Sequence, residues 1–172
     1  TPHSPVASHL TLLATSENGY RNLSRLVTLS RASDRGEARA TWGQVESHAE
    51  GLFCLTGCSF GEVPQLLTRD DERAARKHLG HLADVFHGHV AIECWDHALA
   101  SERALVPRLI ALAGTLDIPW VVTNDVHYAT PRGRLVHDVL TCLRHQTTLD
   151  AAGTLLRPNA EWYLKHPERM AH

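Results

Sequence analysis

The chain has few aromatic residues, no long apolar run and no excess of positive charge, and each absence excludes a class of protein. Aromatic side chains make up 6% of the 172 residues, too few for the stacking surfaces that bind single-stranded nucleic acid. The formal net charge of −2 gives no broad basic surface, so any DNA contact would be local or supplied by other parts of a larger protein. No stretch approaches the ~18 apolar residues of a membrane-spanning helix, and the amino terminus lacks a signal-peptide pattern. We therefore expect no membrane partner.

The cysteines also lack a pattern. Cys54, Cys58, Cys94 and Cys142 form no C-x-x-C pair and no regular framework. A zinc ribbon and a small secreted disulfide scaffold are therefore disfavoured, and a reducing cytoplasm is the simpler context. Histidine is abundant, with 13 residues, which hints at metal chemistry, although several histidines fall on expected helix surfaces.

Short apolar strands alternate with amphipathic helices along most of the chain. Strands are expected at 9–14, 51–57, 90–95 and 118–124, and helices at 18–31, 63–68, 70–86, 101–116 and 130–145. The polar 32–50 segment is expected to be a loop with a short helical turn near 42–47. This alternation predicts βαβ units in a mainly parallel sheet, with 118–123 as a buried strand. Four strands are few for a closed barrel, so the sheet is open or incomplete.

Several local signals refine these helices. The acidic residues Asp70 and Asp71 favour a helix start through the macrodipole. Ser101 and Thr130 are expected as N-caps, with Pro131 at the first helical position. The tail at 161–170 is expected to dock on the rest of the chain.

Asp125 and His127 follow the fourth expected strand. Residues two apart on a strand point the same way, so this carboxylate and imidazole can reach one point in space. They also lie at the carboxyl end of the strand, where parallel α/β folds build their sites. Alternatively, the aspartate only caps the next loop and the histidine is exposed, because short motifs match easily by accident. Cys58 and His9 are equally ambiguous alone, as a small buried side chain and a strand-edge histidine.

Three longer segments resemble a known family when taken together. "HLTLLATSENGYRNLSRLVTLSR", "GLFCLTGCSFGEVPQLL" and "PWVVTNDVHYATPRGRLVHDVLTCLR" are similar, in order and spacing, to the PHP (polymerase and histidinol phosphatase) domain of bacterial DNA polymerase III alpha-type subunits. The Gly-Tyr-x-Asn-Leu and Thr-Asn-Asp-x-His-Tyr segments are the most diagnostic. The stretch "HDVLTCLRHQTTLDAAGTLLRPNAEWYLKHPERMA" resembles the error-prone, damage-tolerant type more than the main replicative type.

The resemblance implies an α/β fold, namely part of a distorted PHP-type β/α barrel with mainly parallel strands alternating with helices. Residues 1–146 would be the carboxyl-terminal portion of the PHP domain, and 147–172 the start of the connection to a polymerase core. It also implies that His9, Cys58, Asp125 and His127 are metal ligands in a cleft. Such a mixed N, S and O set suits zinc, manganese or iron better than calcium. The chemistry implied is attack of metal-activated water on a phosphodiester, as in a 3′–5′ exonuclease. The resemblance gives no other catalytic residue and no organic cofactor site.

The sequence also departs from the family pattern. The amino-terminal His-x-His motif and the Asp, His and Glu ligands expected before the His-Leu-x-x-Leu-Ala segment are absent, so we expect the sequence to begin inside the domain. By the same resemblance, some members of the family bind up to three divalent ions. Four ligands cannot hold three ions, so this chain alone is expected to be an inactive phosphoesterase. Its loss of strands should leave an unpaired sheet edge and exposed apolar surface. Cys58, Asp125 and His127 each follow the carboxyl end of an expected parallel strand, so their side chains should lie within about 10 Å of one another.

The implied parent is a cytoplasmic bacterial enzyme for template-directed DNA synthesis in damage-tolerant replication and repair. Its partners would be DNA, deoxynucleoside triphosphates and other polymerase or translesion subunits, with magnesium bound outside this chain. One alternative is a non-catalytic scaffold that braces the polymerase core. Another is a free-standing PHP phosphatase, which Gly-Tyr-Arg-Asn-Leu and the long tail disfavour. Three further histidines fall on expected helices and are not assigned as ligands: His78, His81 and His137. His97 is a possible additional metal ligand, and it too is left unassigned.

Overall fold

The computed structural model of the chain describes residues 8–32 and 38–170. The part of the expected 32–50 connection at 33–37 lies outside these residues. The chain divides into two compact units, Thr1–Glu93 with Pro107–Val121, and Cys94–Val106 with Val122–His172. Each unit is therefore discontinuous in sequence. Within the described ranges, no helix is both long enough and apolar enough to cross a membrane.

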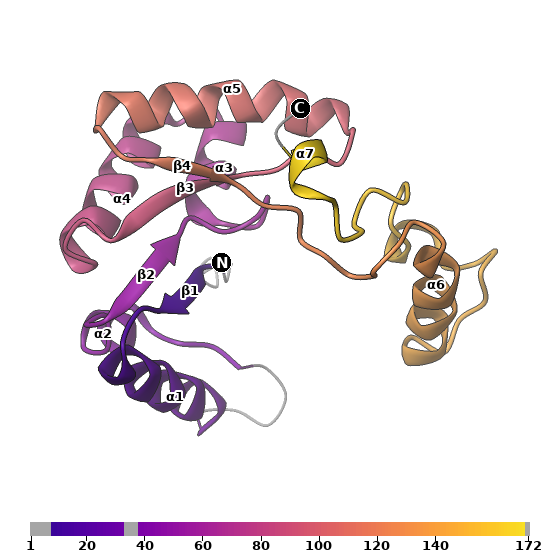
Figure 1. The fold of residues 1–172 in the computed structure, drawn as a ribbon, viewed down its shortest axis with the longest axis horizontal. Helices are drawn as coiled ribbons and strands as arrows, with labels where there is room; N and C mark the ends of the chain where they lie inside the picture. Colours follow the sequence, from indigo (N-terminus) through magenta and orange to yellow (C-terminus); the bar gives the residue numbers. More distant parts are fainter. Residues whose placement is uncertain (1–7, 33–37, 171–172) are drawn as a thin grey trace, which may run out of the picture. The chain divides into compact units, whose positions relative to one another are not determined.

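A four-stranded sheet, nearly all of it in the first unit, has the strand order β1-β2-β3-β4. The strands are β1 (Thr11–Ala14), β2 (Leu52–Leu55), β3 (Val90–Cys94) and β4 (Trp120–Val122), with helices between them (Figure 1). The α/β class and the alternation of strands with helices are confirmed. The pair β2–β3 is parallel, as expected, but β1 and β2 are antiparallel. The expectation of parallel βαβ units was therefore wrong for the first connection.

The antiparallel direction of β1 goes with a close backbone contact where β1 ends and β2 begins. Ala14 lies opposite Leu52, and the Thr15 amide donates to the Gly51 carbonyl at 2.9 Å. A β-carbon on Gly19 would lie 1.8 Å from the Gly51 oxygen, so the backbones touch there. The chain leaves β1 and enters β2 at the same end of the sheet, which makes the two strands antiparallel.

Two helices fill the connection between these strands. Helix α1 (Glu17–Ala32) packs against β1 and β2, and the short α2 (Trp42–Glu46) packs against α1. The turn expected near 42–47 is confirmed as α2, which starts with a capping box: the Thr41 hydroxyl accepts from the Gln44 amide, and the Gln44 side chain accepts from the Thr41 amide.

The core of the first unit lies between the sheet and the helices that follow β2. These are α3 (Glu62–Thr68), α4 (Glu72–Val85) and the second half of α5 (Ala100–Thr115), which contains Pro107 as expected. The Asp71 side chain caps α4 by accepting from the Ala74 amide at 3.0 Å, which confirms the acidic start. Each fully buried aliphatic side chain contributes about 1.5–3 kcal/mol. The fully buried apolar residues are Leu52, Val63, Leu67, Leu79, Leu82, Phe86, Val90, Ile92, Leu109 and Leu112.

Strand β4 is exposed, whereas the sequence predicted a buried strand. Trp120, Val121 and Val122 are 50%, 39% and 40% exposed. Their apolar, β-branched character predicted a strand here. The strand is confirmed, and next to it the Ile92 amide of β3 donates to the Pro119 carbonyl at 2.9 Å. The burial prediction failed because β4 is the last strand in the sheet order, and a strand is buried on both faces only where other elements cover them.

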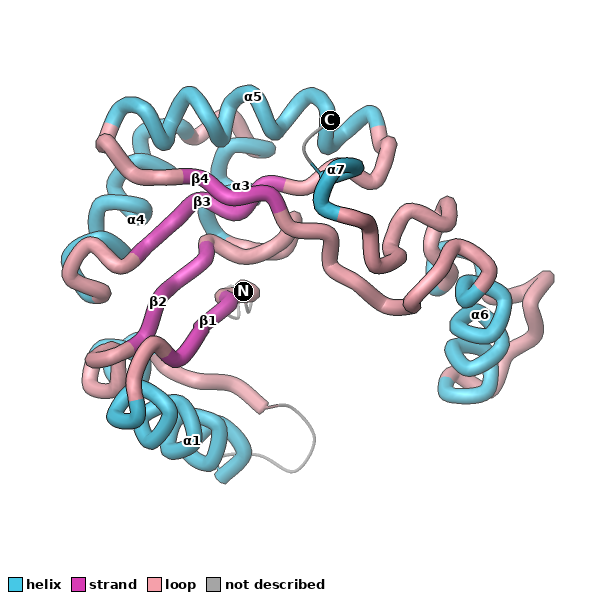
Figure 2. The backbone as a smooth tube through the Cα atoms, in the orientation of Figure 1, coloured by secondary structure: helices cyan, strands magenta, loops and turns pink. Residues whose placement is uncertain are grey.

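The second unit contains the first part of α5, α6 (Gly133–Arg144), a 3₁₀ turn η1 (Gly153–Leu155) and α7 (Pro167–Met170). Long loops join these elements (Figure 2, pink). Tyr128, Trp162 and Tyr163 form its apolar cluster, with Leu99 packed against them. Trp162 and Tyr163 are 4% and 9% exposed, so the tail docks within this unit, as expected.

Two helix starts differ from the prediction. Ser101 lies inside α5, which begins at Ala100. Helix α6 begins at Gly133 without a side-chain cap, because the Thr130–Gly133 segment first closes a turn through the Gly133 amide and the Thr130 carbonyl at 2.9 Å. A β-carbon on Gly133 would lie 2.7 Å from that of Tyr128, so packing against Tyr128 fixes this turn.

The His78 side chain on α4 should make stability depend on pH. Burial lowers its pKa below the ordinary 6.5; the Glu62 carboxylate raises it, and His81 lowers it further. His78 is therefore protonated less readily in the fold than in the unfolded chain. Its contribution to the free energy of unfolding is complete above about pH 6.5 and is lost as the pH falls below that value. Urea unfolding of H78Q between pH 5 and 7.5 should show a smaller acid-induced loss than the unsubstituted protein. Identical pH profiles would contradict this assignment.

Candidate metal centre

His9 and Cys58 come together in the first unit. The Cys58 Sγ lies 3.4 Å from the His9 Nδ1. The His9 amide donates to the Phe60 carbonyl at 3.0 Å, and the two rings are tilted with their centroids 5.4 Å apart. His9 thus contacts two residues of the loop after β2, Cys58 and Phe60. His9 and Cys58, which are 49 positions apart in sequence, form an N/S donor pair.

Two glycines allow this loop to approach His9. Gly57 has φ +84°, and a β-carbon there would lie 2.5 Å from the His9 carbonyl oxygen. A β-carbon on Gly61 would lie 2.2 Å from the Thr56 carbonyl oxygen. A larger residue at position 57 would clash with the His9 backbone, and one at position 61 with the backbone of the loop itself, so either would force the loop to shift.

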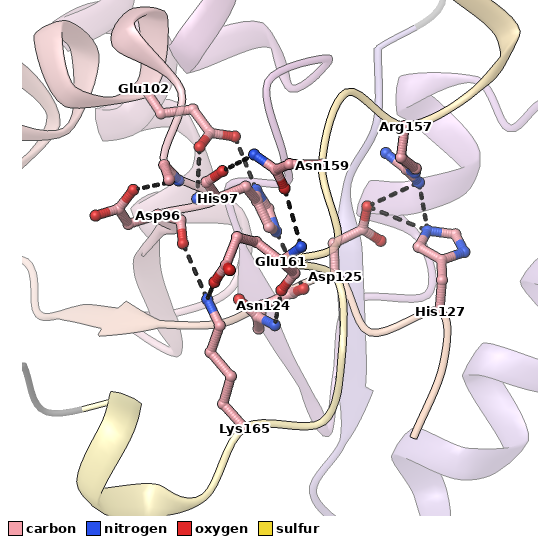
Figure 3. Close-up of polar contacts among 11 residues, drawn as sticks. Asp96, His97, Glu102, Asn124, Asp125, His127, Arg157, Asn159, Glu161 and Lys165 are labelled. Atoms are coloured by element: carbon pink, nitrogen blue, oxygen red, sulfur yellow. Dashed lines mark hydrogen bonds and ion pairs between the residues drawn. The ribbon is translucent and has the colours of Figure 1, made fainter. Parts of the chain in front are cut away.

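Asp125 and His127 form a second donor pair, in the second unit. The Asp125 Oδ2 lies 3.3 Å from the His127 Nε2 (Figure 3). The pair is not arranged as strand alternation predicted, because β4 ends at Val122 and Asp125 has φ +39°. Aspartate tolerates this left-handed conformation better than most residues. The two side chains meet through a loop bend instead.

Asn124 anchors this loop to the tail of the second unit. It is 6% exposed, and its side-chain amide donates to the carbonyls of Glu161 at 2.9 Å and Tyr163 at 2.7 Å. The His127 amide donates to the Trp162 carbonyl at 2.9 Å. Three bonds to consecutive tail residues thus fix the backbone on both sides of Asp125.

His97 supports the same loop from within the unit. Its Nδ1 lies 2.8 Å from Glu102 Oε1, and its Nε2 lies 3.1 Å from the Asn124 carbonyl oxygen (Figure 3). The ring is 3% exposed and stacks on Trp162 with centroids 4.2 Å apart. Both nitrogens are engaged, so a metal ion could use His97 only by breaking one of these contacts. The arrangement fits a residue that supports the loop.

Arg157 is a site residue that the sequence did not reveal. Its Nη2 lies 3.2 Å from Asp125 Oδ2 and also contacts His127 Nε2 (Figure 3). The guanidinium carbon lies 4.9 Å from the Trp162 ring centroid. No local pattern marks Arg157, because it lies 32 positions from Asp125 in an irregular segment.

Two groups close to the donor pairs in sequence have raised pKa values. Burial raises the pKa of Cys54 to about 12, and the Glu93 charge acts in the same direction. Cys54 is therefore a neutral thiol and a poor metal ligand. Burial also raises the pKa of Tyr128, so its hydroxyl stays protonated. Of the four cysteines, Cys54, Cys94 and Cys142 are buried, whereas Cys58 is partly exposed.

The spacing of both pairs fits a metal ion. For tetrahedral zinc, bond lengths of about 2.0–2.3 Å place two N or O ligands about 3.3 Å apart and an N/S pair about 3.5 Å apart. The observed separations are 3.3 Å for Asp125–His127 and 3.4 Å for His9–Cys58. Across residues 8–32 and 38–170, no group of three or more potential ligands is close enough to hold an ion. Since the two pairs belong to different units, the convergence of Cys58 with Asp125 and His127 stays a prediction.

The reactivity of Cys58 should report on its ligand role. In the native full-length protein, iodoacetamide should modify Cys58 before the buried Cys54, Cys94 and Cys142. Saturating Zn²⁺ should slow the Cys58 reaction roughly tenfold, because a metal-bound thiolate is no longer a free nucleophile. Peptide mapping by mass spectrometry measures the rates. The H9A variant should lose this protection.

The matched control is H48Q, which changes a histidine that contacts Ser47 and the Gln44 carbonyl instead. It should retain the zinc protection of Cys58. Equal protection in H9A and H48Q would remove His9 from the ligand set.

Comparison with known proteins agrees with the resemblance read from the sequence. The family model described as "PHP domain" matches residues 2–97. DNA polymerase III subunit alpha of Treponema pallidum is 39% identical over 95% of this chain and 14% of its own length. The error-prone DNA polymerase of Symbiobacterium thermophilum is 36% identical over 94% of the chain and 16% of its own length. DNA polymerase III subunit alpha of Thermus aquaticus is 34% identical over 94% of the chain and 13% of its own length. The chain thus spans only a small part of these relatives, and it belongs to the PHP domain family.

Proposed function

We propose that this chain is part of a DNA polymerase of the polymerase III alpha type and that its PHP region binds divalent metal ions. The observation that carries the metal assignment is the spacing of Asp125 and His127, whose ligand atoms lie 3.3 Å apart. His9 and Cys58 add a second pair with a separation of 3.4 Å. Both pairs occupy the positions that resemblance to the family assigned to ligands.

The four residues would hold zinc, manganese or iron, because their N, S and O atoms suit these ions better than calcium. A bound ion would supply a water activated for attack on a phosphodiester and would stabilise the negative charge that develops there. The carboxylate of Asp125 and the imidazole of His127 would orient the site, and Asn124 holds their loop in place. Hydrolysis from a 3′ end is the reaction that fits this chemistry.

The parent reaction would be template-directed nucleotide addition to DNA from deoxynucleoside triphosphates, with magnesium bound outside this chain. In this proposal, residues 1–146 are the carboxyl-terminal portion of the PHP domain and 147–172 begin the connection to the polymerase core. Other polymerase or translesion subunits would be its protein partners in the bacterial cytoplasm. The support is that the similar proteins named above are DNA polymerases several times longer than this chain.

The error-prone subtype is the finer part of the proposal. It rests on the 137–171 segment and on similarity to an error-prone polymerase at 36% identity, although a polymerase III alpha subunit is 39% identical. Primer extension opposite an abasic template site tests it. The full-length protein should insert a nucleotide and extend past the site, and a stop directly before it would favour the replicative type.

A non-catalytic scaffold is the second candidate, and Arg157 is the observation that favours it. This side chain forms an ion pair with Asp125 at 3.2 Å. A PHP region used only to brace the polymerase core would need this pairing and no metal. A free-standing phosphatase has less support, since the relatives are long polymerases.

The double variant D125N/H127A in the full-length protein separates these candidates. Losing two ligands should lower the bound transition-metal content measured by elemental analysis, because an under-coordinated ion dissociates. Primer extension should fall less, since nucleotide addition would use a separate site. Asparagine also tolerates the positive φ of residue 125, so the loop should keep its bend.

The control D150N/H145A makes the same chemical changes at exposed positions of the same unit. It should leave the metal content unchanged. Equal metal content in both double variants, with both proteins folded, would favour the scaffold.

A further inference from the structure

Arg157 contacts the same two side chains, Asp125 and His127, that would bind a metal ion. One nitrogen, Nη2, contacts both the Asp125 Oδ2, at 3.2 Å, and the His127 Nε2. An ion shared by the pair would be bound by the same two atoms. The guanidinium is a permanent cation.

The atoms that Arg157 contacts are the atoms that a metal ion would use. The Nη2 group carries only N–H donors and has no lone pair to offer. Its neighbours, the Asp125 carboxylate oxygen and the His127 Nε2, are the two possible ligand atoms of this pair.

Arg157 is held in this position by several contacts. Its guanidinium lies over the Trp162 ring at 4.9 Å, and its backbone carbonyl accepts from Arg134 Nη2 at 2.8 Å. Trp162 is 4% exposed and stacks on His97. The Arg157 side chain itself is 30% exposed, so it is partly enclosed yet has a route to solvent.

We infer that Arg157 is a built-in competitor for the metal ion at Asp125 and His127. Its guanidinium pairs with the Asp125 carboxylate and contacts the His127 Nε2. A divalent ion can bind the pair only when the guanidinium leaves, because the two cations compete for the same atoms and repel each other. Arg157 thereby sets the metal affinity of this pair. The inference rests on the proposed metal-binding function and adds to it a residue that opposes binding.

The test is the Zn²⁺ affinity of R157Q in the full-length protein, measured by titration against a chelator of known affinity. Glutamine keeps a polar side chain of similar length but removes the cation. Partly exposed ion pairs are worth up to about 1 kcal/mol, which corresponds to roughly fivefold tighter Zn²⁺ binding. R157K keeps the charge and should fall between R157Q and the unsubstituted protein, since lysine cannot present the planar fork.

R144Q is the matched control for net charge. Arg144 is exposed in the last turn of α6, and its substitution should leave Zn²⁺ affinity unchanged. The R157Q effect should also vanish in the D125N/H127A background, because the competition requires the ligand pair. This comparison separates the pair from any other zinc site in the protein.

Unchanged or weaker Zn²⁺ binding by R157Q would overturn the inference, as would an equal gain in R144Q. The proposed metal function fails separately, if D125N/H127A leaves the metal content of the protein unchanged. In that case a gain of zinc binding by R157Q that disappears in R157Q/D125N/H127A would show that Arg157 blocks the pair, whereas a gain that persists there would place the zinc elsewhere and overturn the inference. Melting curves without metal check that each variant is folded.

Discussion

The bonds of the Asn124 side chain to the backbone of residues 161 and 163 are the constraint on which the second unit depends. This unit has long loops and little regular structure, so backbone groups that a helix or sheet would satisfy need other partners. The buried side-chain amide of Asn124 donates to two carbonyls, and the backbone carbonyl oxygen of Asn124 lies 3.1 Å from His97 Nε2. The donor pair of Asp125 and His127 inherits its position from these contacts, since it follows Asn124 directly in the chain.

The two donor pairs are positioned by different physical means. Cys58 reaches His9 in a loop where Gly57 leaves room for the His9 backbone and Gly61 leaves room for the backbone of the loop itself. Asp125 reaches His127 because a left-handed bend turns the chain back on itself. The first pair therefore depends on space and the second on backbone conformation. Substitutions that add volume threaten the first pair, whereas those that remove hydrogen bonds threaten the second.

Much of the fold was predictable because its signals are local. The acidic cap and apolar periodicity of α4 lie within one segment, and the β-branched residues of β4 identify a strand. The direction of β1 was not predictable, because it depends on the end of the sheet at which the chain enters β2, which no local pattern shows. The exposure of β4 depends on which elements cover it. Resemblance to a family proposed His9, Cys58, Asp125 and His127 as ligands, whereas Arg157 is brought to Asp125 only by tertiary structure.

The interleaving of the two units has a consequence for how the protein is synthesised. The first unit takes its last strand and half of α5 from residues 107–121, after the chain has already contributed residues 94–106 to the second unit. On the ribosome, the sheet cannot acquire β4 until residue 122 has emerged, so β3 must wait with one edge unpaired. A recombinant fragment cut where the family match ends, at residue 97, would leave that edge open permanently. A recombinant fragment of this region should therefore extend beyond Tyr163, so that it includes the tail residues that bond to Asn124.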